Sequence, residues 1–337
     1  MSSAADPFLE RAPARLRAHL HVLGGEFTVE SDDRAPLDLA VEAFGGLPRH
    51  RLGSEPRRFR VRLAATDGDR SWPRSAEPPR PTLVSGAGLL CATVDAHNFV
   101  VVDVALSRAL VCVSRAMFAH RYHARYELVE LAFLTLASRA QALVPLHAAC
   151  IGAGGSGVLL IGPSGAGKST LALHALASGL EVLAEDSAFV DTGGLRVTGV
   201  PNYVHVPAAA LASLERGPLE ACVRRAPVIQ RRSGVRKHEV DLRAVPGRIA
   251  ATPLRLAAVV FLSPLRGASA APLVAVGPDS LLRRLRREQP YAAGLESWAA
   301  FERRIVDVPA YELRRTGHPR EAVARLEALL GNGGVAP

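Results

Sequence analysis

The sequence predicts an α/β domain in the second part of the chain, preceded by a β-rich α+β region. Three observations support this fold class. A short apolar segment, a glycine-rich loop and a helical pattern follow one another over residues 158–179. Short alternating segments bounded by turn residues dominate residues 1–135. Apolar residues make up 48% of the chain, enough for a core in each part, so we expect a β-rich region over 1–135 and an α/β domain over 136–337.

In the first region, alternation and turn residues predict strands, and apolar residues at helical spacing predict two helices. The strands are expected over 27–30, 57–63 and, as three consecutive strands, 89–114, and the helices over 37–44 and 126–142. The second region alternates strand and helix patterns, as α/β folds do. Its strands are expected over 144–151, 157–161, 181–184, 189–191, 195–197 and 254–262, and its helices over 171–177, 208–214, 280–287 and 321–330.

Charge and composition argue against several classes of protein. The net charge of +9 suits an anionic partner, but aromatic residues make up only 5% and none interleave with a basic stripe, which argues against nucleic acid. No run of about 18 apolar residues predicts a membrane span, and the first residues lack the pattern of a secretory signal. The four cysteines are widely spaced, as buried thiols of a reducing compartment are. We therefore expect a cytoplasmic protein without a membrane segment.

The most informative feature is the phosphate-loop pattern G-x-x-x-x-G-K-[ST], which lies between a predicted strand and a predicted helix. Its glycines let backbone N–H groups turn toward a phosphate, and the helix N-terminus adds positive charge. Lys168 is expected to reach the β- and γ-phosphates of a nucleoside triphosphate, and the Ser169 hydroxyl to ligate Mg²⁺. The predicted nucleotide-binding residues are Gly162, Pro163, Ser164, Gly165, Ala166, Gly167, Lys168, Ser169 and Thr170.

The scarcity of lysine indicates a second cation. Of the 41 Lys and Arg residues, only Lys168 and Lys237 are lysines. In a chain that fills ordinary cationic positions with arginine, a lysine suggests a need for a compact ammonium. Lys237 is therefore a candidate active-site cation, with a surface lysine as the alternative. Arg236 and Arg248, in the segment 201–253 that we expect to carry the substrate side, are further candidates, with a solvated basic loop as the alternative.

Two acids, Glu185 and Asp186, follow the strand predicted after the phosphate-loop helix. Carboxylates at the carboxyl end of a strand beside the loop suit a Mg²⁺ ligand or a general base. Because adjacent strand residues point to opposite faces, we expect one acid to face the metal and the other to take the proton of an acceptor hydroxyl. Which acid does which stays open, and a solvated acidic turn is the alternative. His147, one strand before the loop, could orient a carboxylate or the acceptor, with a histidine that has no role in the site as the alternative that the residues alone favour.

Residues 146–191 resemble the catalytic domain of HPr kinase/phosphorylase. The matching features are His147 at the entry of a strand, a glycine-rich turn, the run G-V-L-L-I-G, a phosphate loop of the S-G-x-G-K-S kind, and the step Ala184-Glu185-Asp186. No signature of the L-S-G-G-Q kind points to an ABC transporter ATPase. Neither lysine follows an asparagine, which argues against GTPases of the Ras type.

The resemblance implies a fold shared with phosphoenolpyruvate carboxykinase and phosphoryl transfer to a seryl hydroxyl. It implies ATP and Mg²⁺ as cofactors, metal and base work by Glu185 and Asp186, and a supporting role for His147. Relatives of this fold often assemble into hexamers, so a homo-oligomer is one option and the oligomeric state stays open. Thr170 and Glu185 stand where the family has a glutamate and an aspartate, and residues 1–135 do not resemble the bifunctional enzyme. The chain is thus more similar to the wider HPr-kinase-related group, which includes kinases of small ribosomal peptides.

Together these features predict a kinase that uses ATP and Mg²⁺ to phosphorylate a hydroxyl, in the first place a serine of a peptide or protein acceptor. Two alternatives stay open. One is a nucleotide-dependent binding or regulatory module that hydrolyses ATP slowly, in which residues 1–135 dock a partner. The other is a small-molecule kinase. GTP or pyrophosphate as the donor is equally open.

Overall fold

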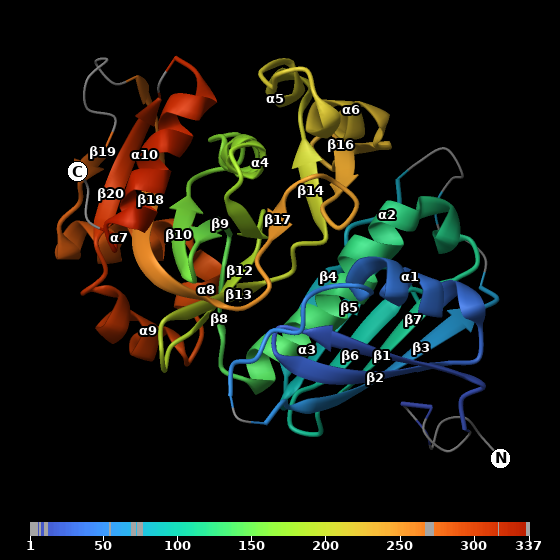
Figure 1. The fold of residues 1–337 in the computed structure, drawn as a ribbon. Helices are drawn as coiled ribbons and strands as arrows, with labels where there is room; N and C mark the ends of the chain where they lie inside the picture. Colours follow the sequence, from blue (N-terminus) through green and yellow to red (C-terminus); the bar gives the residue numbers. More distant parts are fainter. Residues whose placement is uncertain are drawn as a thin grey trace. The chain divides into compact units, whose positions relative to one another are not determined.

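A computed structural model describes residues 6, 8–9, 13–53, 55–68, 72, 77–266, 273–315 and 317–334. The chain divides into two compact units, Met1–Gln141 and Ala142–Pro337. The boundary expected at residue 135 lies within helix α3 (Leu131–Ala140) of the first unit. Both units combine sheet and helix, so the expected mixed α/β class is confirmed (Figure 1). None of the helices in the described part of the chain has the length and apolar character that crossing a membrane requires.

In the described residues, the first unit is built on a seven-stranded sheet in the order β1-β2-β3-β7-β6-β5-β4. Strands β2, β3 and β7 are parallel, and the other neighbours are antiparallel. The period-2 patterns therefore predicted real strands, although β1 and β4 were missed. The strands are β1 (Leu16–Val22), β2 (Gly25–Ser31), β3 (Arg58–Thr66), β4 (Thr82–Gly86), β5 (Leu89–Thr93), β6 (Phe99–Asp103) and β7 (Arg108–Ser114).

Two helices of the first unit pack on the same face of this sheet. The rings of Phe27 on β2 and Phe44 on α1 each lie 4.8 Å from Phe133 on α3. Arg125 is 1% exposed in this layer, where a charge needs partners, and its guanidinium lies 3.4 Å from Glu130. The helical segments are α1 (Arg34–Phe44), a 3₁₀ turn (Met117–His120), α2 (Arg121–His123), a π-helical segment (Ala124–Glu130) and α3.

The centre of the second unit is a ten-stranded sheet within the described residues. Its main path runs β17-β11-β9-β10-β18-β13-β12-β8, while β20 pairs with β18 and β19 pairs with β20. Strands β10, β18 and β20 are parallel, so their carboxyl ends reach one edge of the sheet. The strands are β8 (Val144–Leu146), β9 (Ala148–Ala153), β10 (Ser156–Ile161), β11 (Glu181–Ala184), β12 (Ala188–Asp191), β13 (Arg196–Gly199), β17 (Arg248–Ile249), β18 (Leu254–Arg266), β19 (Leu273–Ala275) and β20 (Ala310–Arg315).

Helices cover both faces of this sheet, because alternate residues of its central strands are apolar on either side (Figure 1). Leu160 of β10 packs in the layer of α4 and α10, and its neighbour Leu159 packs in the layer of α7 and α9. The helices of the unit are α4 (Lys168–Ala177), α5 (Ala208–Ala212), α6 (Pro218–Arg225), α7 (Pro278–Glu288), α8 (Pro290–Ala293), α9 (Trp298–Ile305) and α10 (Pro319–Gly331).

The segment 201–253 carries a small sheet of its own, in the order β14-β16-β15. Its strands are β14 (Tyr203–Val206), β15 (Val228–Gln230) and β16 (Arg236–Asp241). Val206 of β14 and Val240 of β16 belong to the same buried cluster as Leu173 of α4. This packing fixes the small sheet beside the helix that begins at the phosphate loop.

One predicted strand is wrong. Residues 144–151 form two strands, β8 and β9, which are interrupted at His147. β8 pairs with β12, and β9 pairs with β10 and β11, so the two halves lie at different places in the sheet. The backbone of His147 is bound by the side chain of Gln289 instead. The His147 N–H donates to Oε1 of Gln289 at 2.7 Å, and Nε2 of Gln289 donates to the His147 carbonyl at 3.3 Å.

Candidate active site

The predicted phosphate loop connects β10 to α4, as its sequence pattern requires. Gly165 and Gly167 have φ of +83° and +107°, a left-handed region that disfavours any residue with a Cβ. A Cβ at either glycine would meet nothing within 4 Å, so the positions directly above these two glycines are open. Gly162 differs, because a Cβ there would lie 3.0 Å from Cβ of Ala166. Gly162 thus permits close packing against Ala166, and Gly165 and Gly167 permit the left-handed backbone of the turn.

Lys168 is buried at the first turn of α4, with 6% of its surface exposed. Its ammonium donates to the carbonyl of Gly162 at 2.7 Å and lies 3.0 Å from Nε2 of His147. Burial lowers the pKa of Lys168, and the charges of Asp186 and Glu185 oppose this shift without cancelling it. A buried ammonium held by a carbonyl and an imidazole is one that a phosphate anion would stabilise.

Glu185 follows β11 and is buried between helix α4 and strand β14. The Ser169 hydroxyl of α4 donates to Oε1 of Glu185, and Nδ1 of His205 lies 3.6 Å from Oε2. His205, on β14, reaches Glu239 of β16 with its other nitrogen, at 3.3 Å. Burial raises the pKa of Glu185, but His205 and Ser169 outweigh it and the pKa lies below its usual value. Burial likewise lowers the pKa of His205, and the two carboxylates outweigh it and raise that pKa.

Asp186 has different partners from Glu185. Oδ1 of Asp186 lies 3.1 Å from Nδ1 of His147, and Oδ2 lies 3.8 Å from the Arg231 guanidinium. A charged Lys168 ammonium can only donate, so Nε2 of His147 accepts from it. The ring proton of a neutral His147 is then on Nδ1, where it donates to Asp186. Lysine, histidine and aspartate therefore form one directed chain of hydrogen bonds beside the loop.

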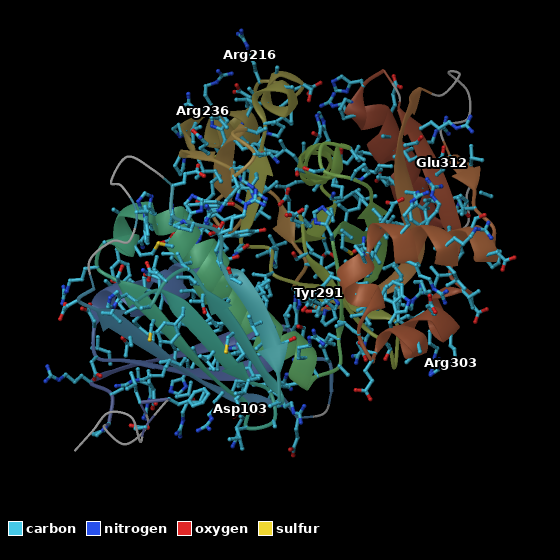
Figure 2. The ribbon with its side chains drawn as sticks, turned by 180° about the vertical axis from the view of Figure 1, so that it is seen from behind. Asp103, Arg216, Arg236, Tyr291, Arg303 and Glu312 are labelled. Carbon is cyan, nitrogen blue, oxygen red and sulfur yellow. The ribbon has the colours of Figure 1, made fainter. Side chains whose placement is uncertain are left out.

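The basic residues of segment 201–253 fall into two groups. Lys237 lies on β16, and its charge contributes to lowering the pKa of both Lys168 and Glu185. Arg236, next to it on β16, is exposed (Figure 2). Arg248 lies on β17, which pairs with the start of β11, at the strand end opposite to the acids. Among Lys237, Arg236 and Arg248, the charge of Lys237 is the one that acts on Lys168, and its role as an active-site cation stays a prediction.

The donor set can be compared with what ATP and Mg²⁺ need. In the described residues, no group of three or more His, Cys, Asp or Glu side chains could hold a metal by itself. Mg²⁺ in nucleotide sites uses one or two carboxylates and completes its octahedron with phosphate oxygens and water. The hydroxyl of Ser169 and the carboxylate of Glu185, already in contact, fit that requirement. The glycine cradle and Lys168 fit the phosphates.

Four residues of the site were not predicted from the sequence as site residues. His205, Glu239 and Gln289 belong to elements far along the chain from the loop, and Arg231 was one arginine in a basic segment. One signal was present, because His205 stands between two valines and so faces the opposite side of β14 from them. Nothing local marked Gln289, whose role comes from where α7 ends.

Comparisons with solved structures give a weak likeness. No protein-family model matches the chain, and no curated protein has a similar sequence. Among solved structures, the Hpr(Ser) kinase/phosphatase from Coxiella burnetii aligns with 15% sequence identity and a TM-score of 0.28. The alignment covers 56% of this chain and 88% of that chain. We draw nothing about the site from a likeness at this TM-score.

Proposed function

We propose that the chain is a phosphotransferase that uses ATP and Mg²⁺ to phosphorylate a hydroxyl group, with a serine of a peptide or protein as the acceptor. The observation that carries this proposal is the joint position of three parts. They are a glycine loop with space above it, the Ser169–Glu185 pair, and the chain from Lys168 through His147 to Asp186. Phosphoryl transfer needs positioning and charge neutralisation more than covalent chemistry, and these parts supply both.

Glu185 and Asp186 differ in burial, and this difference supports a different role for each acid. Glu185 is 7% exposed and bound by Ser169 and His205, which suits a carboxylate that supports the metal. The side chain of Asp186 is 27% exposed, so an acceptor hydroxyl can approach it. A general base must lie within hydrogen-bond reach of the proton it takes. We therefore assign the base to Asp186, which His147 orients through Nδ1.

The cations complete the proposed chemistry. Ser169 and Glu185 would hold Mg²⁺, which when bound would neutralise part of the charge of the phosphates. Lys168 would leave the Gly162 carbonyl and bind the phosphates. Arg231 and Lys237, on the small sheet and its turn, would face the charge that develops on the moving phosphoryl group. Asp186 would accept the hydroxyl proton as the acceptor oxygen bonds to the γ-phosphorus, the bond from that phosphorus to the β–γ bridging oxygen breaks, and ADP leaves.

The test is transfer of label from γ-³²P-ATP, with Mg²⁺, into an extract of the source cells, with Lys168→Ala as the control. Label in a protein or peptide band that is absent with the variant is the expected result. Label only in a small-molecule fraction would show that the acceptor is a small molecule and not a peptide or protein. Label only as free phosphate would favour a slow ATPase that acts as a regulatory module. No bound nucleotide and no label would overturn the proposal.

A further inference from the structure

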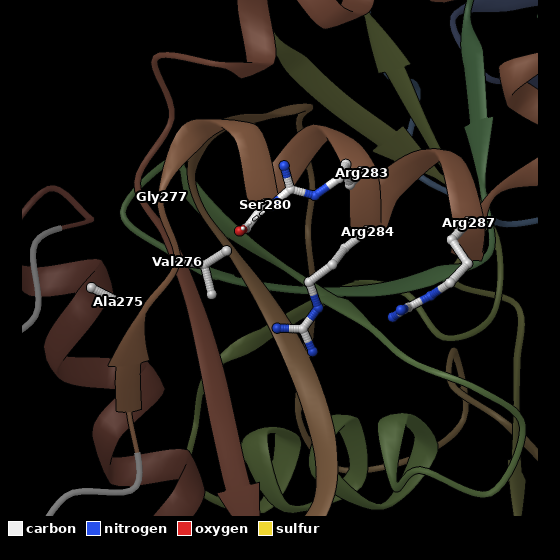
Figure 3. A pocket seen from close by; sticks show the side chains of 7 residues that line it. All are labelled: Ala275, Val276, Gly277, Ser280, Arg283, Arg284 and Arg287. Atoms are coloured by element: carbon white, nitrogen blue, oxygen red, sulfur yellow. Dashed lines mark hydrogen bonds between the residues drawn. The ribbon is translucent and has the colours of Figure 1, made fainter.

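A hollow of about 590 Å³ lies along helix α7 (Figure 3). One wall is the segment 275–277, which comprises the last residue of β19 and the two residues after it, and the other is the helix face formed by Ser280, Arg283, Arg284 and Arg287. These four positions follow the i, i+3, i+4, i+7 pattern of one helix face. The opposite face of α7 packs into the core through Leu281 and Leu285. Because Leu281 and Leu285 are buried in the core, the arginines on the other face of α7 line the hollow.

The three arginines differ in what holds them. Arg284 pairs with Glu312 at 2.9 Å and lies 4.4 Å from the centroid of the Phe261 ring, so it forms a fixed wall. Arg283 donates to the Ser280 hydroxyl at 2.9 Å, and within the described residues it has no carboxylate partner. A guanidinium with only a hydroxyl partner retains its capacity for a bidentate bond to a carboxylate or phosphate.

The helix leads from the hollow to the candidate active site. Arg287, whose side chain is 70% exposed, pairs with Glu288 at 3.1 Å at the last residue of α7. Glu288 is near enough to Lys168 for its charge to act on that ammonium. The next residue, Gln289, binds the backbone of His147 in both directions. A ligand that lies along the arginines toward Arg287 therefore approaches the phosphate-loop edge of the sheet.

We propose that this hollow binds an acidic segment of the polypeptide acceptor and so presents the acceptor serine to Asp186. This inference rests on the proposed function and adds a substrate class to it. The exposed Arg283 and Arg287 are four residues apart, which is about 6 Å along a helix. Carboxylates two residues apart on an extended peptide are separated by about 6.7 Å. The spacing thus favours acceptors with two acidic residues separated by one, beside the serine.

The experiment measures peptide binding without nucleotide, so that it does not depend on catalysis. Two fluorescein-labelled peptides are compared by anisotropy: one has a serine beside a Glu-Gly-Glu step, and the other has Gln-Gly-Gln in its place. We expect at least tenfold tighter binding of the glutamate peptide. The double substitution Arg283→Glu and Arg287→Glu should remove this difference, and Arg283→Ala alone should reduce it several-fold.

The matched control is Arg325→Glu, an equal change of charge per residue on the exposed side of α10, which packs on the other face of the sheet. It should leave the Kd within about twofold, since a distant exposed charge is screened. Equal binding of both peptides, or equal weakening by Arg325→Glu, would overturn the proposal, as would tighter binding of an oligonucleotide of the same charge. Lys168→Ala should leave peptide binding unchanged, so loss of nucleotide chemistry and loss of acceptor binding are read separately.

Discussion

The ammonium of Lys168 lies 3.0 Å from Nε2 of His147, so the lysine of the phosphate loop and the histidine at the strand break share one hydrogen bond. In the proposed function this contact would couple nucleotide binding to the chemistry at the acceptor. When a phosphate draws the ammonium away, Nε2 of His147 loses its donor, while Nδ1 still faces Asp186 at 3.1 Å. Binding of the nucleotide would thereby leave Nε2 of His147 available for a hydrogen bond with the acceptor.

Substitution of Lys168 by alanine should abolish transfer and leave the fold intact. The ammonium contacts the Gly162 carbonyl of the loop, and removal of one such donor typically costs about 100- to 1,000-fold in turnover. We expect a loss of at least about 100-fold in label transfer, and weaker nucleotide binding. Far-UV circular dichroism and the melting temperature serve as the folding control. Full activity in a folded variant would refute the assignment of the loop.

Asp186→Asn should reduce turnover far more than nucleotide affinity. The amide keeps the size of the side chain but cannot take a proton, and a general base contributes about 100- to 10,000-fold. We expect a fall in kcat in that range with a change in nucleotide Kd below about threefold. Asp191→Asn is the matched control, because its side chain is 24% exposed and also pairs with an arginine. Equal losses in kcat and affinity would indicate a metal ligand instead.

Local patterns predicted the loop, both acids and most of the strands near them, because each depends on neighbours in sequence. The break at His147 was hidden, since 144–151 reads as one continuous apolar strand, and only the positions of β12 and Gln289 separate its halves. The contact of His205 with Glu185 joins residues of separate sheets. Contacts of this kind come from tertiary packing, which no short window of sequence contains.

His205→Gln should raise the Mg²⁺ concentration needed for half-maximal activity. His205 contacts Glu185, the proposed metal-supporting carboxylate, and Glu239 behind it. Loss of such an outer partner typically costs about 10- to 100-fold in metal affinity or activity. We expect a shift of that size at saturating ATP, and a smaller one than with His205→Ala. His238→Gln, on β16, is the control. An unchanged Mg²⁺ requirement with only a lower melting temperature would reduce His205 to a structural residue.

We expect His174 to make the second unit sensitive to acid. It is 1% exposed on α4, and Nε2 lies 2.9 Å from the Ser213 hydroxyl. Burial, and then the charges of His318 and Arg320, lower the pKa of His174 from 6.5 to about 4. Between these values the unfolded chain binds a proton that the folded chain does not, so stability is full above pH 6.5 and falls as the pH drops toward 4.

This loss of stability is measurable as the slope of the free energy of unfolding against pH. One pKa unit corresponds to about 1.4 kcal/mol, so His174 should account for about 3 kcal/mol between those pH values. Urea unfolding followed by Trp298, in a Trp72→Phe background, reports on the second unit, where Trp298 lies in the core. His174→Gln should flatten the slope, whereas His97→Gln, an exposed histidine of the first unit, should not. The same slope in His174→Gln and in the parent would show that other groups cause the acid sensitivity.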